Sequence, residues 1–230
     1  MDFLHNFIFG IYPYIATTVF LIGSWIRFDT EQYTWKSDSS QLLSKRSMRF
    51  ASNVFHYGIL GLFLGHVAGL LTPHAVFLGL GISDLIHQWT AILAGAIFGS
   101  ACLLGAIVLW LRRMTNPRVR AASRWMDINI LGWLALTAAA GLITIPTSVH
   151  HATAGDAETM IRLANWIQSI LYLHPDPQLV KDASPVYKFH MFLGMSVFLF
   201  FPFTRLVHIW SAPFGYLGRA YQIVRRKRTA

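Results

Sequence analysis

The stretch FASNVFHYGILGLFLGHVAGLL, residues 50–71, is long and apolar enough to cross a membrane as one helix. Two histidines, His56 and His66, interrupt it. An imidazole in hydrocarbon is costly, so a histidine inside a membrane span marks a functional site by default. The stretch therefore predicts a membrane protein with a polar site among its helices.

The composition of the whole chain agrees with a membrane protein. Of 230 residues, 54% are hydrophobic and 13% charged, with a mean hydropathy of +0.46. These values are typical of a polytopic membrane protein and atypical of a soluble domain. We predict an all-α, polytopic fold with five transmembrane helices: Phe3–Ile26, Phe50–Leu71, Trp89–Leu111, Ile128–Thr147 and Phe189–Ile209.

The basic residues predict the orientation of the spans. All 19 Lys and Arg residues except Arg162, Lys181 and Lys188 fall on one side of the predicted bundle. The positive-inside rule then places the N-terminus outside and the C-terminus in the cytoplasm. We predict a membrane domain over residues 1–213 and a basic cytoplasmic tail over 214–230. The net charge of +9 follows this topology, so we expect no nucleic-acid partner.

The single cysteine, Cys102, excludes several cofactors on this chain. No disulfide can form within the chain, and no Cys-x-x-Cys-His motif exists to attach a c-type haem. An iron–sulfur cluster needs several thiolates and is excluded as well.

A second pair of histidines, His190 and His208, lies in the fifth predicted span. Because the second and fifth spans run in opposite directions, His56 matches His208 in depth and His66 matches His190. Two bis-histidine sites, one near each face of the membrane, fit two b-type haems held by axial imidazoles alone. Zinc fits less well, since its sites draw more ligands together, often with Cys or carboxylate.

The spacing of the two pairs does not match perfectly. The ten residues from His56 to His66 rise about 15 Å in a helix, whereas the eighteen from His190 to His208 rise about 27 Å. We expect a tilt of the fifth span and a bend at Pro202 to reduce this difference. At about 100° per residue, His190 and His208 are expected on one face of a continuous helix.

Glycines surround these histidines and have two interpretations. Small residues let a flat macrocycle approach the helix backbone, or Gly61, Gly65 and Gly69 form a small-xxx-small seam with another helix. The glycines are Gly58, Gly61, Gly65, Gly69 and Gly194.

The other six histidines are predicted on the outer side, most of them as solvated loop residues: His5, His74, His87, His150, His151 and His174. His87, just before the third span, is either an ordinary interfacial histidine or a group that exchanges a proton with a quinol. The long outer loop over residues 149–187 contains a predicted amphipathic helix at 160–173.

Several strings around the histidines resemble the gamma subunit of the membrane-bound respiratory nitrate reductase. They are IYPYI (11–15), FLIGSWIRFD (20–29), QYTW (32–35), ASNVFHYGILG (51–61), GH (65–66), LTPH (71–74) and FPFTRLVHIWS (201–211). The resemblance implies a di-haem cytochrome b of the bacterial cytoplasmic membrane. It implies an inner haem on His56 and His208, an outer haem on His66 and His190, and quinol oxidation beside the outer haem.

From the residues and this resemblance together we predict a complete electron path. Quinol would dock near Gly65, His66, Gly69 and His87, with His66 and His87 as the catalytic residues. Electrons would pass to an iron–sulfur subunit on the cytoplasmic face and then to a molybdenum subunit that reduces nitrate to nitrite. His87 takes the place of a lysine that family members can carry near the quinol site.

Three arginines at the inner boundary, Arg112, Arg113 and Arg205, either pair with haem propionates or only follow the positive-inside rule. The basic end at 215–228 either docks the iron–sulfur subunit or contacts anionic lipid. Two alternative functions stay open. One is the cytochrome b subunit of another quinone-linked oxidoreductase, and the other is a haem-free transporter or scaffold, which would carry charges along its spans.

Overall fold

The computed structural model describes residues 2–35 and 45–211, and all regular secondary structure in these ranges is helical. Five helical stretches there are long and apolar enough to cross a membrane: Asp2–Thr30, Met48–Leu71, Asp84–Thr115, Trp125–Thr153 and Pro185–Phe203. The all-α fold and the five predicted spans are confirmed. Most spans extend beyond their predicted ends because polar residues continue the helices past the apolar core, as at Asp84 after its cap Ser83.

The first span combines three helical segments. These are α1 (Asp2–Asn6), the π-helical turn η1 (Phe7–Ile11) and α2 (Tyr12–Thr30). Pro13 lacks the backbone N–H that would bond to the carbonyl four residues earlier, and the π turn lies directly before it. Such turns let a membrane helix continue through a proline.

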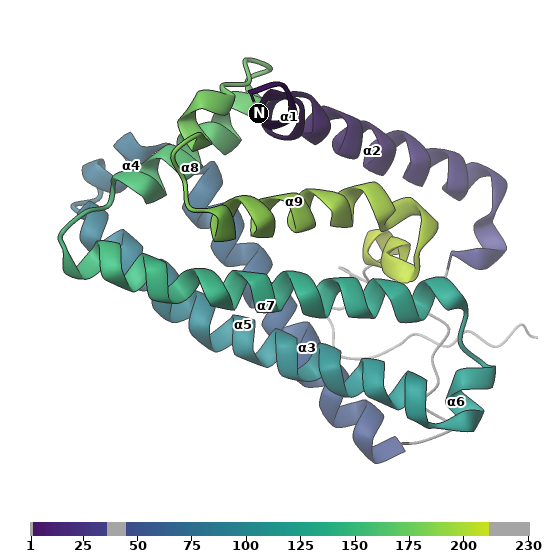
Figure 1. Ribbon diagram of the computed structural model, residues 1–230. Helices are drawn as coiled ribbons and strands as arrows, with labels where there is room; N and C mark the ends of the chain where they lie inside the picture. The colour runs from purple at the N-terminus through teal and green to yellow at the C-terminus, as the bar shows by residue number, and fades with distance from the viewer. Residues whose placement is uncertain (1, 36–44, 212–230) are drawn as a thin grey trace, which may run out of the picture.

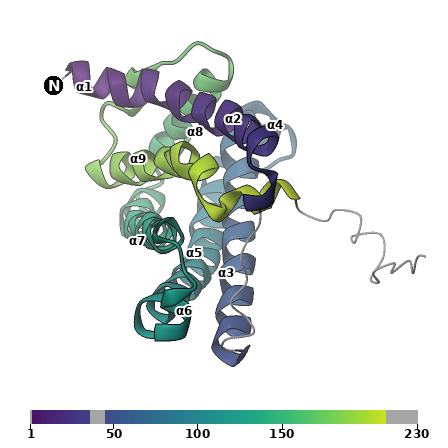
Figure 2. The ribbon, with the colours of Figure 1, turned by 90° about the vertical axis from the view of Figure 1, so that its right-hand side faces the viewer.

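The five spans pack in a row (Figures 1 and 2). Helix α3 (Lys45–His66), extended by the π turn η4 (Val67–Leu71), packs on α5 (Asp84–Thr115), and α5 packs on α7 (Trp125–Thr153). Next in the row comes α9 (Pro185–Phe200), which packs on α7 and on α2. Helices α3 and α9 both carry candidate histidines, and α5 and α7 stand between them in this order.

Helices α3 and α5 approach closely through glycines. A Cβ atom on Gly58 would lie 2.3 Å from the backbone nitrogen of Cys102, and one on Gly105 would lie 2.5 Å from that of Phe55. Neither position has room for a side chain, so the two backbones meet directly, as small residues allow in membrane proteins.

The fifth predicted span is not one continuous helix. After α9, a 3-10 turn, η6 (Phe201–Phe203), contains Pro202, and Thr204 is extended before a second 3-10 segment, η7 (Arg205–Ser211). The expectation that His190 and His208 share one face of a continuous helix is wrong, because His208 lies on η7. Figure 1 shows this segment, in yellow, folded back beside the end of α9. The break removes the mismatch between the 15 Å and 27 Å spacings, since eighteen residues no longer run straight.

Arg27, in the last turn of α2, holds this break. Its Nη1 donates to the carbonyl oxygens of Pro202 at 2.6 Å and Thr204 at 2.8 Å, and its Nη2 donates to the carbonyl of Thr34 at 3.2 Å. A Cβ on Gly23 would lie 2.9 Å from Cγ of Pro202, so α2 also contacts the break directly. The carbonyls that a broken helix leaves without partners are thereby satisfied.

Short helices cover the end of the row that carries His66. They are α4 (His74–Gly79) and α8 (Glu158–Leu171). Helix α8 confirms the amphipathic helix predicted in the long loop. Trp166 of α8 donates to the carbonyl of Phe9 at 2.9 Å, and Gln168 donates to that of Leu70 at 3.0 Å. The remaining short segments connect the spans: η2 (Gln32–Thr34), α6 (Pro117–Ala121) and η5 (Pro177–Val180).

The predicted cytoplasmic tail at 214–230, with its basic stretch 215–228, lies outside the described residues. Its separation from a membrane domain at 1–213 stays a prediction.

Candidate functional site

The four histidines form two pairs across the bundle. The ring centroids of His56 and His208 lie 6.4 Å apart, and those of His66 and His190 lie 6.2 Å apart. These are the two depth-matched pairs that the sequence predicts. Helix α3 supplies one member of each pair, while η7 and α9 supply the others.

Each histidine uses its Nδ1 atom for a bond to the backbone. Nδ1 lies 2.7 Å from the carbonyl oxygen of residue 52 for His56, 2.8 Å from that of residue 62 for His66, 3.1 Å from that of residue 137 for His190, and 2.5 Å from that of residue 205 for His208. A carbonyl only accepts, so Nδ1 carries the hydrogen and Nε2 keeps its lone pair. This is the tautomer that metal-ligating histidines adopt.

The distance within each pair fits one shared metal ion. Two imidazoles bound to one ion through bonds of about 2.0 Å place their ring centroids about 6.3 Å apart. Among the described residues, no group of three or more His, Cys, Asp or Glu side chains gathers at a point. Two protein ligands per ion suit the axial positions of a b-type haem, whose porphyrin supplies the other ligands. The residues present fit this cofactor at both pairs.

Some of these glycines border space for a macrocycle, and others pack against a neighbouring helix. A Cβ on Gly65 or Gly194, next to the His66 and His190 pair, would meet no atom within 4 Å, so both positions border open space. Gly58 and Gly61 instead pack against α5, where a Cβ on Gly61 would lie 2.3 Å from the ring of Phe98. The predicted seam through Gly61, Gly65 and Gly69 therefore does not form as one surface.

Gly141 of α7 also shapes the site around His190, which the spacing of the histidines does not predict. A Cβ there would lie 2.9 Å from Cε1 of His190. The missing side chain lets the His190 ring lie against α7, where its Nδ1 reaches the carbonyl of Thr137. The candidate outer site therefore uses three spans, α3, α7 and α9.

The inner arginines differ in their surroundings. Arg112 and Arg113 are buried in the last turn of α5, and Arg113 donates to Oγ of Ser123 at 2.7 Å. Arg205 begins η7, and its carbonyl accepts the hydrogen bond from His208. Through this bond, Arg205 is tied directly to a candidate ligand.

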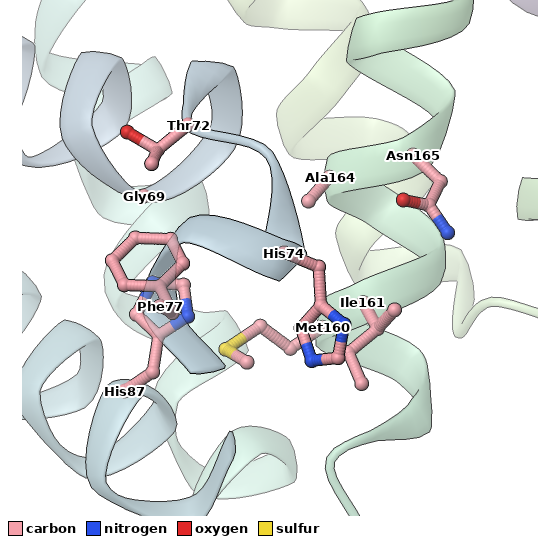
Figure 3. Close-up of a pocket in the computed structure, with 9 residues that line it drawn as sticks. All are labelled: Gly69, Thr72, His74, Phe77, His87, Met160, Ile161, Ala164 and Asn165. Atoms are coloured by element: carbon pink, nitrogen blue, oxygen red, sulfur yellow. The ribbon is translucent and has the colours of Figure 1, made fainter. Parts of the chain in front are cut away.

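A small pocket lies one helical turn beyond His66 (Figure 3). It is lined by Gly69, Thr72, His74, Phe77, His87, Met160, Ile161, Ala164 and Asn165. The ring of His87 stacks on Phe77 with centroids 4.0 Å apart, and a Cβ on Gly69 would lie 3.4 Å from Nε2 of His87. Two predicted substrate residues, Gly69 and His87, thus line one pocket, and α8 forms its opposite wall.

His74, which was predicted to be on the outer side among mostly solvated histidines, also belongs to the pocket. His74 lines the pocket, and its Nε2 lies 2.5 Å from Oδ1 of Asp84. The two residues are ten positions apart and belong to different helices, α4 and α5. Only the turn between these helices brings them together.

Comparison with known proteins shows the family of this chain. The family model for the nitrate reductase gamma subunit matches residues 5–227, a range that contains all four paired histidines. This chain belongs to the nitrate reductase gamma subunit family. It is 47% identical over 228 residues to the respiratory nitrate reductase 1 gamma chain of Escherichia coli, covering 99% of this chain and 100% of that protein. The nitrate reductase gamma chain of Bacillus subtilis is 36% identical, with 96% of this chain and 97% of that protein covered.

This chain therefore covers nearly the whole length of these gamma chains. The respiratory nitrate reductase 2 gamma chain of Escherichia coli is 46% identical over 99% of this chain. The two histidine pairs and the last four candidate spans lie inside the matched range, and the first span, Asp2–Thr30, begins just before it.

Proposed function

We propose that this gamma subunit is a di-haem cytochrome b that oxidises quinol near His66 and delivers electrons, near His56, to partner subunits that reduce nitrate to nitrite. The observation that carries the proposal is the presence of two histidine pairs, 6.2 Å and 6.4 Å between ring centroids, near opposite ends of a membrane-spanning bundle. The names of the relatives, respiratory nitrate reductases, support nitrate as the final acceptor.

A b-type haem bound between each pair would supply an iron that takes up and gives up one electron at a time. His56 and His208 would hold the inner group, and His66 and His190 the outer group. The backbone bonds at Nδ1 fix each ring and leave the lone pair of Nε2 available to bind the iron. The open space beside Gly65 and Gly194 would admit the macrocycle at the outer pair.

The pocket around His87 is the proposed quinol site. It begins at Gly69, three residues after His66, so a quinol there would lie next to the outer pair. Both nitrogens of His66 have a role already, Nδ1 with the carbonyl of Leu62 and Nε2 with the ion. We therefore assign His66 to electron transfer and His87, packed on Phe77, to binding a quinol oxygen and taking its proton.

The positive-inside rule supports the direction of the path. With the N-terminus outside and the C-terminus in the cytoplasm, the quinol pocket faces the outside of the bacterial cytoplasmic membrane. Protons would be released there, while electrons would leave inward to an iron–sulfur subunit and a molybdenum subunit. Separate destinations for protons and electrons would make the reaction charge-separating.

The arginines at the inner end have two possible roles in this proposal. Arg205, three residues before His208, is placed to pair with a propionate of the inner haem, as an Arg–carboxylate match. Arg112 lies at the same end of the bundle, in the last turn of α5, and the same role or a purely topological one fits it.

Family membership supports the nitrate reductase function over the alternatives. A cytochrome b subunit of another quinone-linked enzyme would carry similar histidines, but the full-length relatives are nitrate reductase chains. If the protein were a transporter without haem, nothing would explain why the two histidine pairs have nearly the same distance between their rings.

The test uses the intact, haem-loaded complex and a short-chain quinol. We expect the quinol to reduce haem absorbance and to support nitrate reduction, and we expect His87→Gln to slow haem reduction by about 100-fold, within the range for lost proton transfer. His174→Gln, an exposed histidine in the long loop, is the control and should keep the wild-type rate. The proposal fails if dithionite reduces the haems of the wild type but the quinol does not.

A further inference from the structure

We propose that His74 and Asp84 form a proton-accepting pair at the quinol pocket, with His74 as a second base beside His87. This inference rests on the proposed quinol oxidation and adds an assignment for each of the two protons. The geometry that carries it is the contact of 2.5 Å between His74 Nε2 and Asp84 Oδ1 at the pocket wall.

The pair lies between the pocket and the surface. The side chains of His74 and Asp84 are 35% and 34% exposed, so the pair reaches the surface of the bundle. Figure 3 shows the His74 ring between α4 and α8, on the opposite side of the pocket from Gly69 and Thr72. A proton taken up in the pocket therefore has a short route to water through this residue.

The lining of the pocket leaves few groups for this task. Helix α8 contributes Met160, Ile161, Ala164 and Asn165, none of which titrates. Among the lining residues, only His74 and His87 carry a side chain that exchanges protons near neutral pH. A quinol has two hydroxyl protons to release, and the pocket has two imidazoles that can each accept one.

The contact with Asp84 gives His74 the arrangement of a general base. With Asp84 ionised, His74 donates Nε2–H to the carboxylate and keeps a lone pair on Nδ1. A carboxylate that orients an imidazole in this way also stabilises the imidazolium that forms when the base takes a proton. Asp84 is held in turn at the first position of α5, after the Ser83 cap.

For one quinol, the two O–H bonds break, one proton goes to Nδ1 of His74 and the other to His87, and the two electrons leave one at a time. The outer haem of the proposed function would pass the first electron to the inner haem before it took up the second. The product is the quinone. His74 and His87 then return to the neutral form by releasing these two protons to the outer water.

The experiment measures haem reduction in the intact complex after mixing with a short-chain quinol, over a range of pH, and again with dithionite. His74→Gln should slow the quinol reaction by about 100-fold and change the dependence of its rate on pH, since one of the two proton-accepting groups is lost. Asp84→Asn should also slow it, and Asp84→Glu should restore most of the rate. Dithionite reduction and the haem spectrum should be unchanged in all three, which shows that the variants fold and load haem.

The chain offers a matched control. His151 and Asp156 form a similar pair, 2.9 Å apart with side chains 29% and 43% exposed, but neither lines the pocket. His151→Gln should therefore keep the wild-type rate and pH profile. A wild-type rate in His74→Gln, or an equal loss in His151→Gln, would overturn the assignment. A wild-type complex that dithionite reduces and quinol does not would instead overturn quinol oxidation itself.

Discussion

The guanidinium of Arg27 donates to the carbonyl oxygen of Pro202 at 2.6 Å, although 175 residues separate them in the chain. The same Nη1 atom also donates to the carbonyl of Thr204 at 2.8 Å. Four residues beyond Thr204 lies His208, whose ring faces His56. Arg27 therefore ties the first span to the break that places the inner histidine pair.

We expect Arg27→Gln to disturb the inner haem and to spare the outer one. Glutamine cannot reach both carbonyls, and losing hydrogen bonds from a charged donor costs about 3 kcal/mol. The potentiometric component that depends on His208 should shift or disappear, whereas the component that depends on His66 should not change. Redox titration of the visible spectrum separates the two components, and Arg27→Lys should recover part of the inner one.

The matched control is Arg162, which also binds backbone carbonyls. Its Nε donates to the carbonyl of Leu179 at 3.0 Å, and its Nη2 donates to that of Gln178 at 3.2 Å, at the opposite end of the bundle. Arg162→Gln should leave the inner component unchanged. Equal effects of both arginine substitutions on that component would contradict a specific role for Arg27.

Two glycines of α3 should respond in opposite ways to alanine. Gly65→Ala adds a methyl group to open space and improves helix propensity by about 0.5–1 kcal/mol, so the fold should stay intact. If the macrocycle lies there, the outer haem spectrum or its potential should nevertheless change. Gly58→Ala would force α3 away from Cys102 and should lower the stability by about 2 kcal/mol. Thermal unfolding and redox titration of both variants test this, and an unaltered outer haem in Gly65→Ala would count against the site.

Gly141→Ala should act on His190 alone. The added methyl group would lie 2.9 Å from Cε1 of this ring, so the ring must move away from α7. We expect loss or a clear shift of the outer component with the inner one retained. Loss of the inner component instead would show that the histidine pairs are assigned to the wrong haems.

The orientation can be tested by chemical labelling. In a Cys102→Ser background, single cysteines replace Tyr172 in the long loop and Thr115 at the end of α5, both exposed positions. The positive-inside rule predicts that an impermeant maleimide labels Tyr172→Cys in intact cells and Thr115→Cys only after permeabilisation. The reverse pattern would invert the proposed topology and place the quinol pocket inside.

The spans and the histidine pairs could be predicted because both depend on local and periodic features. Apolar length gives a span directly, and two antiparallel helices match His56 with His208 and His66 with His190 by depth alone. The break in the fifth span after Phe200 could not be predicted from such local features. Pro202 indicates a bend, but the fold-back depends on Arg27, and no local pattern connects these residues.

Contacts between distant helices explain the other differences. Gly58 and Gly65 look alike in the sequence, yet one meets the backbone of Cys102 and the other meets open space. His74 resembles a loop histidine until the turn between α4 and α5 brings Asp84 within 2.5 Å. The residue type indicates which chemistry is available, and the packing of helices decides which residues can carry it out.

The most direct test of the two-haem account is a reduced-minus-oxidised spectrum with haem quantification on the purified complex, for the wild type, His66→Ala and His208→Ala. The account predicts two b haems for each gamma subunit, with His66→Ala losing one potentiometric component and His208→Ala losing the other. A well-folded wild type without haem, or loss of the same component in both variants, would contradict it.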